Sequence, residues 1–134
     1  MTDVVPFLAY EDLAAAAAWL VRAFGFEEVE RFEEDGEVGH VTLRHGEGLI
    51  FLGRPPGYVC PRRLREQVEL VARMYDTPYL VGGVFALVAD VDAHAERARA
   101  AGARILSEPD ASPRGRLYRV EDLEGGRWMF ETQA

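Results

Sequence analysis

Two side chains on predicted strands, His40 and Glu131, are the best-placed acid–base groups in the sequence. His40 alternates with Thr42 and Arg44 along one strand, so the three side chains share one face. Glu131 lies two residues beyond Met129 and therefore on the same side of the last strand. A histidine and a carboxylate that face a cavity can exchange protons with a ligand. A structural or solvated role is the alternative for each.

Other kinds of chemistry are restricted by composition. Tyr118 can add a hydroxyl to the same space, or it can be a core tyrosine with its hydroxyl at the rim. All fifteen basic residues are arginine, which excludes lysine Schiff bases. Cys60 is the only cysteine, so internal disulfides and CxxC metal motifs are excluded. His40 and His45 are five residues apart and point to opposite faces of a continuous strand, so they form no metal-binding pair.

The elements that must position these groups occur twice. Each copy is a short apolar strand, an aspartate (Asp12 or Asp90), an alanine-rich amphipathic run and a glycine. Aspartate is a favoured helix N-cap and glycine a favoured helix stop. The two helices are expected over residues 13–24 and 91–101.

Strands complete both copies. Alternating apolar residues and turn signals predict strands near residues 4–10, 27–32, 40–44 and 49–52, from residue 84, and near 104–107, 116–121 and 127–132. Because such a module cannot bury its sheet alone, two modules are expected to share one core, with a concave space for a ligand between paired sheets. We therefore expect a single domain with module one at 1–53, a helical linker at 54–83 and module two at 84–134.

The linker is expected to be partly helical. Leu64, Val68, Val71 and Tyr75 follow one another at helical spacing. Three arginines, Arg62, Arg63 and Arg65, crowd the first turn against the helix dipole. They are expected either to meet acidic groups elsewhere in the chain or on a second subunit, or to remain in solvent.

Charge and hydropathy indicate which classes of partner and which cellular location to expect. The net charge of -8 disfavours nucleic acid. No apolar run approaches the ~20 residues of a membrane helix, so no membrane association is expected. The first residues lack the features of a signal peptide, and a cytoplasmic location is the expectation.

The duplicated pattern, which ends in the segment YRVEDLEGGRWMF from Tyr118 to Phe130, resembles the vicinal oxygen chelate superfamily. That superfamily includes glyoxalase I, bleomycin-resistance proteins and extradiol dioxygenases. The resemblance covers nearly the whole chain. It implies an α+β fold in which two β-α-β-β-β modules pair curved mixed sheets around a cavity, and it implies a homodimer.

In metal-dependent members the resemblance implies four metal ligands, one on the first and one on the last strand of each module. The corresponding residues here are Val5, Phe51, Gly83 and Met129. None of them can coordinate a hard divalent cation, which prefers imidazole or carboxylate. We therefore expect neither a metal nor another cofactor.

Apolar side chains are expected to form the walls of the cavity. Phe7 and Phe85 occupy equivalent positions on the sheet faces opposite the helices. With Phe51 and Met129 they suit a planar or apolar molecule, and a solid core is the alternative. The candidate ligand-binding residues are Phe7, His40, Phe51, Phe85, Tyr118, Met129 and Glu131.

Three functions fit this sequence. The first is metal-free binding of a small aromatic or hydrophobic compound, such as an antibiotic, by sequestration. The second is a lyase, epimerase or dioxygenase that uses a non-standard metal site built from His40 and Glu131, or metal-free acid–base catalysis by that pair with Tyr118. The third is an interaction module that acts through the linker helix around Leu64 and Val68.

Overall fold

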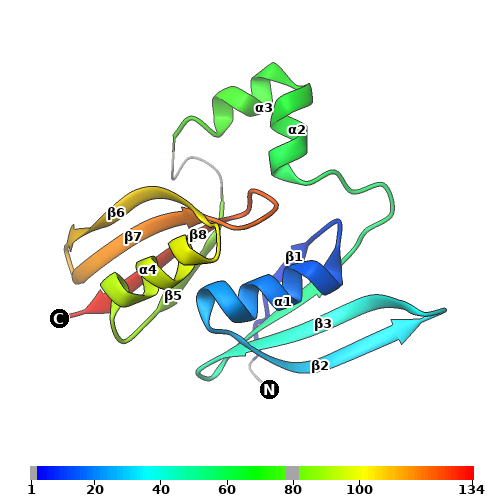
Figure 1. The fold of residues 1–134 in the computed structure, drawn as a ribbon, viewed down its shortest axis with the longest axis horizontal. Helices are drawn as coiled ribbons and strands as arrows, with labels where there is room; N and C mark the ends of the chain where they lie inside the picture. The colour runs from blue at the N-terminus through cyan, green and yellow to red at the C-terminus, as the bar shows by residue number, and fades with distance from the viewer. Residues whose placement is uncertain (1–2, 78–81) are drawn as a thin grey trace. The chain divides into compact units, whose positions relative to one another are not determined.

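The computed structural model describes residues 3–77 and 82–134. It contains two copies of the β-α-β-β-β module (Figure 1). The first copy consists of β1 (Phe7–Ala9), α1 (Leu13–Phe24), β2 (Glu27–Glu34), β3 (Glu37–His45) and β4 (Gly48–Gly53). The second consists of β5 (Val84–Leu87), α4 (Val91–Ala100), β6 (Arg104–Ser112), β7 (Gly115–Glu121) and β8 (Arg127–Gln133). Two short helices, α2 (Pro61–Gln67) and α3 (Glu69–Met74), lie between the copies in the chain. Residues 78–81 of the expected linker lie outside the described residues.

Each module forms one mixed four-stranded sheet. The strand orders are β1-β4-β3-β2 and β5-β8-β7-β6. In both sheets the first pair is parallel and the other two pairs are antiparallel. The α+β class and the two modules are thus confirmed. The chain divides into two compact units, residues 1–60 and 61–134, and α2 and α3 group with the second module. The single domain and the pairing of the sheets around a cavity stay predictions.

The two long helices begin and end where the sequence signals indicate. The carboxylate of Asp12 accepts a hydrogen bond from Ala15 N, and that of Asp90 accepts one from Ala93 N, at 3.1 Å each. Gly25 ends α1 in a left-handed conformation with φ 80°, which glycine adopts without strain. None of the helices in the described part of the chain is long and apolar enough to cross a membrane.

Each helix covers one face of its own sheet. In the first module Ala16, Ala17 and Leu20 are fully buried on α1, as are Val41 and Leu52 on the sheet. Alanine side chains let the helix approach the strands closely, which explains the alanine run. In the second module the expected α4 residues are buried, and the sheet contributes large aromatic side chains. Those residues are Val91, Ala95 and Ala98 on α4 and Tyr118, Val120, Trp128 and Phe130 on the sheet.

Strand β6 is longer than expected. The predicted strand ends near Ser107, and Pro109 and Pro113 follow in the sequence. The strand continues to Ser112, with register shifts on both sides of Ser107. Pro109 lies in the irregular stretch between Ser107 and Asp110, on a strand at the edge of the sheet. Edge strands and bulges tolerate proline because no ladder hydrogen bond there needs its missing N–H.

The linker helix is interrupted, although the predicted spacing is continuous. Val68 is extended, with φ -129° and ψ 111°, and separates α2 from α3. Hydrogen bonds from Val68 N to Leu64 O and from Ala72 N to Val68 O still bridge the break. Extended backbone suits a β-branched residue such as valine, which explains why the helix bends at this position.

Candidate functional site

The first sheet presents an aromatic face on the side away from α1. Phe7 pairs with Phe51, and Phe51 pairs with Thr42 across the sheet. The adjacent row contains Val41 and Leu52, which are buried beneath α1. Because successive residues alternate between faces, Phe7 and Phe51 lie on the helix-free face. Phe7 is 58% exposed there, an unusual environment for a phenylalanine.

His40 lies on this same face in a defined hydrogen-bond chain. Its Nε2 atom is 2.7 Å from Thr42 Oγ1, and Thr42 Oγ1 donates to Glu30 Oε2 at 3.2 Å. A hydroxyl has one proton, and since that proton goes to Glu30, His40 Nε2 is the donor toward Thr42. The imidazole is flanked by Phe32 and Phe51, with ring centroids 5.4 and 5.1 Å away. His40 and Phe51 therefore lie in contact on one face of the sheet.

The second sheet has an equivalent helix-free face. Phe85 pairs with Met129, and the next row joins Leu87, Glu131 and Leu117. Phe85 and Leu87 are 40% and 47% exposed. The structure thus brings Phe85, Met129 and Glu131 onto one surface, as the alternation in the sequence predicts.

Glu131 is buried and has two partners. The carboxylate accepts hydrogen bonds from Arg114 Nε and Ser112 Oγ, both at 3.1 Å. Its side chain is only 1% exposed, so the solvated alternative at the strand end is wrong. Arg114 also lies over the Phe85 ring, with its guanidinium carbon 5.2 Å from the ring centroid. Glu131 is consequently part of a fixed ion pair beside an aromatic ring.

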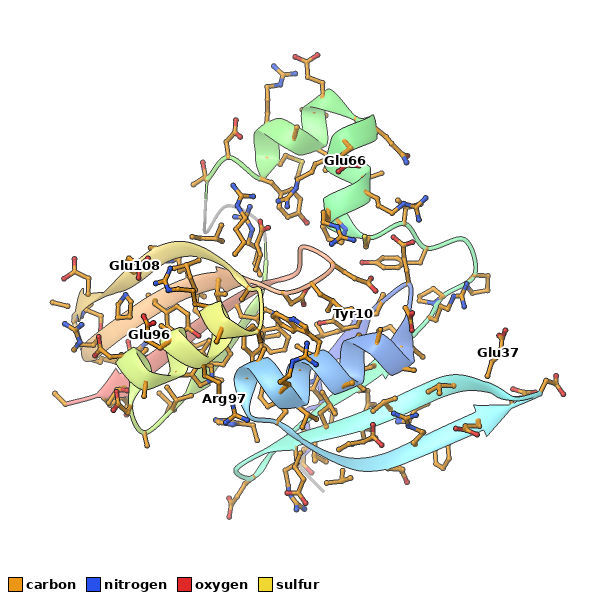
Figure 2. All side chains as sticks on the ribbon, in the orientation of Figure 1. Tyr10, Glu37, Glu66, Glu96, Arg97 and Glu108 are labelled. Carbon is orange, nitrogen blue, oxygen red and sulfur yellow. The ribbon has the colours of Figure 1, made fainter. Side chains whose placement is uncertain are left out.

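A pocket of about 540 Å³ opens on this part of the second module. It lies between the middle of the sheet and the irregular half of β6, and Glu108, labelled in Figure 2, lies on that strand. Its lining includes Leu117, Arg114, Arg119 and Glu131. The volume is within the range that holds drug-sized ligands.

Tyr118 does not join these residues, which corrects one sequence expectation. It pairs with Phe130, one position away from Met129 and Glu131, and so points to the helix side of the sheet. Its hydroxyl lies 2.7 Å from Nδ1 of His94 on α4. Burial raises the pKa of Tyr118 far above its ordinary value, which keeps the phenol neutral. Tyr118 is a core residue, the alternative that the sequence left open.

A buried charged cluster, missed by sequence reasoning, joins α2 to the second sheet. Glu121 accepts two hydrogen bonds from Arg65, at 2.7 and 2.8 Å, and one from Arg127 Nε at 2.7 Å. Both guanidinium groups also lie over the Tyr75 ring, at 5.3 and 4.8 Å. The expectation that linker arginines meet acidic groups is confirmed for Arg65. The arginines in the first turn of the linker helix were the sequence signal for this cluster. They did not identify Glu121 as the partner.

The pKa of Glu121 is lowered by this cluster. Burial alone would raise it, but the hydrogen bonds from Arg65 and the positive charges of Arg127, Arg65 and Arg104 outweigh burial. A carboxyl whose pKa is lower in the folded state stabilises that state above its unfolded pKa. This stability is lost as the pH falls through the lower, folded value.

The free energy of unfolding is therefore expected to fall as the pH drops below the ordinary glutamate value of 4.5. Urea titrations at several pH values between 7 and 3, on wild type and on Glu121→Gln, measure this slope. The variant should be less stable at neutral pH and should lose less stability on acidification. Parallel curves for the two proteins would contradict the assignment.

The residues at the positions where the resemblance implies metal ligands do not fit a metal. Phe51 and Met129 are apolar and lie beside Phe7 and Phe85 in the sheets. At Gly83, a Cβ would come within 2.5 Å of the Arg127 carbonyl oxygen, so a ligating side chain does not fit without backbone movement. Hard divalent cations require oxygen or imidazole donors, which these residues lack.

Comparisons with known proteins agree with this architecture. Residues 4–130 match the model of the Glyoxalase/Bleomycin resistance protein/Dioxygenase superfamily. The crystal structure of TioX from Micromonospora sp. ML1 is 32% identical, with a TM-score of 0.71 over 99% of this chain and 97% of that chain.

Two structures of lower identity share the fold. TnmS3, an antibiotic binding protein from Streptomyces sp. CB03234, is 15% identical, with a TM-score of 0.65 over 99% of this chain and 98% of that one. The bleomycin-binding protein of Streptomyces verticillus, in complex with copper(II)-bleomycin, is 21% identical, with a TM-score of 0.61 over 100% of this chain and 98% of that one.

A further similarity covers part of the chain. Over 80 residues, 59% of this chain, the sequence is 41% identical to pyridoxal 5'-phosphate synthase subunit PdxT of Thermus thermophilus. The match spans 38% of that protein, so the chain corresponds to about two fifths of its length.

Proposed function

Since the chain belongs to the glyoxalase/bleomycin resistance protein/dioxygenase superfamily, we propose that it binds and sequesters a small aromatic or hydrophobic compound without a metal. One observation carries the proposal: each sheet exposes aromatic side chains on the face that its helix leaves uncovered. Two structural neighbours, an antibiotic binding protein and a bleomycin-binding protein, support the binding of a small molecule.

The aromatic face of the first sheet suits a planar ligand. Phe7 and Phe32 are 58% and 57% exposed, and His40 lies between Phe32 and Phe51. Aromatic rings prefer edge-to-face or offset contacts with other rings. Covering such surfaces with a ligand removes them from water, which contributes about 1.5–3 kcal/mol for a fully buried phenylalanine.

The second sheet supplies a comparable surface with a polar border. Phe85 and Leu87 are exposed beside the softer Met129 side chain, and the Arg114–Glu131 ion pair borders them. Binding sites for small molecules combine mostly apolar walls with a few placed polar groups. The proposed binding residues are accordingly Phe7, His40 and Phe51 on the first sheet, and Phe85, Met129 and Glu131 on the second.

Binding of a neutral naphthalene dye, N-phenyl-1-naphthylamine, tests this function. We expect dye fluorescence to rise on binding. Phe7→Ser and Phe85→Ser should each weaken, about tenfold, the dye binding of the sheet that bears the substituted residue, through lost aromatic contact. Leu70→Ser is the matched control, because Leu70 is 60% exposed but lies on α3. Prior dialysis against a chelator should leave the affinities unchanged.

Three results would count against the proposal. These are a wild-type protein that binds no dye, an equal loss in the Leu70 control, and binding that a chelator abolishes.

Acid–base catalysis is the second candidate. The hydrogen-bond chain from His40 through Thr42 to Glu30 favours it, because it orients an imidazole on the proposed binding face. Chemical change of a bound ligand that disappears in His40→Ala would support this candidate over sequestration. The homodimer and the cytoplasmic location stay predictions.

A further inference from the structure

A histidine lies between the two most exposed phenylalanines on the helix-free face of the first sheet. His40 pairs with Phe32 on one side and with Gly53 on the other. The Phe7 ring leans over Gly53, since a Cβ placed there would come within 2.6 Å of two carbons of that ring. Phe7 and Phe32 are 58% and 57% exposed. A planar compound that covers both rings therefore crosses the imidazole of His40.

The hydrogen bonds of this imidazole fix which of its nitrogens carries the proton. The carboxylate of Glu30 can only accept, so the Thr42 hydroxyl uses its one proton to donate to Glu30, at 3.2 Å. His40 Nε2 lies 2.7 Å from the same hydroxyl oxygen and supplies the proton of that second contact. In a neutral imidazole the other nitrogen, Nδ1, is then a hydrogen-bond acceptor.

The accepting nitrogen has no partner of its own. Within residues 3–77 and 82–134, His40 Nδ1 makes no hydrogen bond, and the side chain is 25% exposed. The rings that flank the imidazole, Phe32 and Phe51, carry no N–H or O–H group. A chain of hydrogen bonds that ends at a carboxylate polarises the imidazole and strengthens Nδ1 as an acceptor. The face therefore offers one oriented acceptor among aromatic rings.

The charge at the border of this face disfavours an anionic ligand. Strand β2, at the edge of the sheet, contains five glutamates and one arginine. Arg31 and Arg44 pair with two of these glutamates, so three of the five carboxylates in this described strand are not neutralised by an arginine. Such an edge repels an anion, and it also repels the same edge of a second copy of the chain. A neutral aromatic compound avoids both repulsions.

We infer that the helix-free face of the first sheet binds a neutral phenol, whose rings cover Phe7 and Phe32 and whose hydroxyl donates a hydrogen bond to Nδ1 of His40. This inference rests on the proposed binding function and adds the chemical class of the ligand to it. Thr42 and Glu30 are positioning residues, because they hold the proton on Nε2 and so keep Nδ1 free to accept. Mostly apolar walls with a few placed polar groups are typical of small-molecule sites.

Two ligands with the same rings test the inference. 2-Naphthol has a hydroxyl proton, whereas 2-methoxynaphthalene keeps the oxygen but has no proton to donate. Titrations followed by the NMR signals of β3 give the dissociation constants at the first sheet alone. We expect wild type to bind 2-naphthol about fivefold more tightly than the ether, as one hydrogen bond allows. The ¹⁵N signal of His40 Nδ1 should also shift much further with 2-naphthol than with the ether.

Three variants separate the accepting nitrogen from the aromatic ring. His40→Phe keeps a ring but removes the acceptor, so the two ligands should bind about equally. Thr42→Val keeps the shape of the side chain but frees both tautomers, and it should lower the preference to about twofold. His45→Phe is the matched control and should keep the preference, since His45 lies on the same strand but contacts the buried Phe26. Circular dichroism checks that each variant is folded.

Failure of the inference and failure of the proposed function give different results. If wild type binds both ligands equally at the first sheet, or if His40→Phe keeps the preference, the inference is wrong and the binding function stands. The inference is also wrong if the His45 control loses the preference, or if Thr42→Val keeps it in full. A His40 signal that responds to protein concentration but to neither ligand would show that a second copy covers this face, which overturns the inference. If neither ligand shifts the signals of either sheet, the proposed function itself fails.

Discussion

Replacement of Glu121 by alanine is expected to lower the free energy of unfolding by about 3–5 kcal/mol, the cost of leaving buried charges without their partner. The side chains of Arg127 and Glu121 are 4% and 2% exposed, and that of Arg65 is 16% exposed. Removal of the carboxylate leaves two largely desolvated guanidinium groups side by side over Tyr75. Their mutual repulsion adds to the lost hydrogen bonds.

The loss should be largest where α2 meets the sheet. Urea unfolding at pH 7 measures the global effect, and hydrogen exchange should show the amides of α2 and α3 losing protection first. Glu66→Ala is the control, since Glu66 lies exposed on α2 in the same helical pair (Figure 2) and should change stability by less than about 0.5 kcal/mol. Equal effects of the two substitutions would show that the cluster contributes nothing specific.

Local signals were sufficient for the helices. Asp12 and Asp90 cap their helices through side-chain hydrogen bonds, and both helix starts are where the sequence predicts them. The signal is local because each cap involves residues three positions apart. Alternation likewise placed Phe7 and Phe85 on the helix-free faces, since it depends only on the parity of positions along a strand.

Strand register and the pairing of residues far apart in the chain could not be predicted from the sequence. The sequence left Tyr118 open between the cavity and the core, because the register of β7 against β8 decides whether it lies beside Phe130 or beside Met129. Arg114 and Glu131 are 17 residues apart, and Arg65 and Glu121 are 56 apart. No periodicity links such partners, so the ion pairs that border the proposed site could be found only in the folded chain.

The turn between β7 and β8 depends on a single carboxylate. Asp122 Oδ1 accepts hydrogen bonds from the amides of Glu124 and Gly126, at 3.0 and 2.9 Å, and Oδ2 accepts one from Trp128 Nε1 at 2.9 Å. A Cβ at Gly126 would lie 2.6 Å from Oδ2, which explains the glycine beside this aspartate. Asp122 is 6% exposed, so water has little access to these donors.

Asp122→Ala is therefore expected to lower the free energy of unfolding by about 3–5 kcal/mol, because it leaves three donors without an acceptor and each costs about 1–3 kcal/mol. Asp122→Asn should lose roughly half as much, since its one carbonyl oxygen can serve the two backbone amides while its NH₂ group faces the Trp128 N–H. Urea unfolding followed by tryptophan fluorescence measures both, and exposed Asp76 provides the control variant Asp76→Ala. If Asp122→Ala were as stable as that control, the turn would be held by its glycines alone. A free energy of unfolding that rises from Asp122→Ala through Asp122→Asn to wild type would show that the carboxylate organises this hairpin. The hairpin leads into β8, the strand that bears Met129 and Glu131.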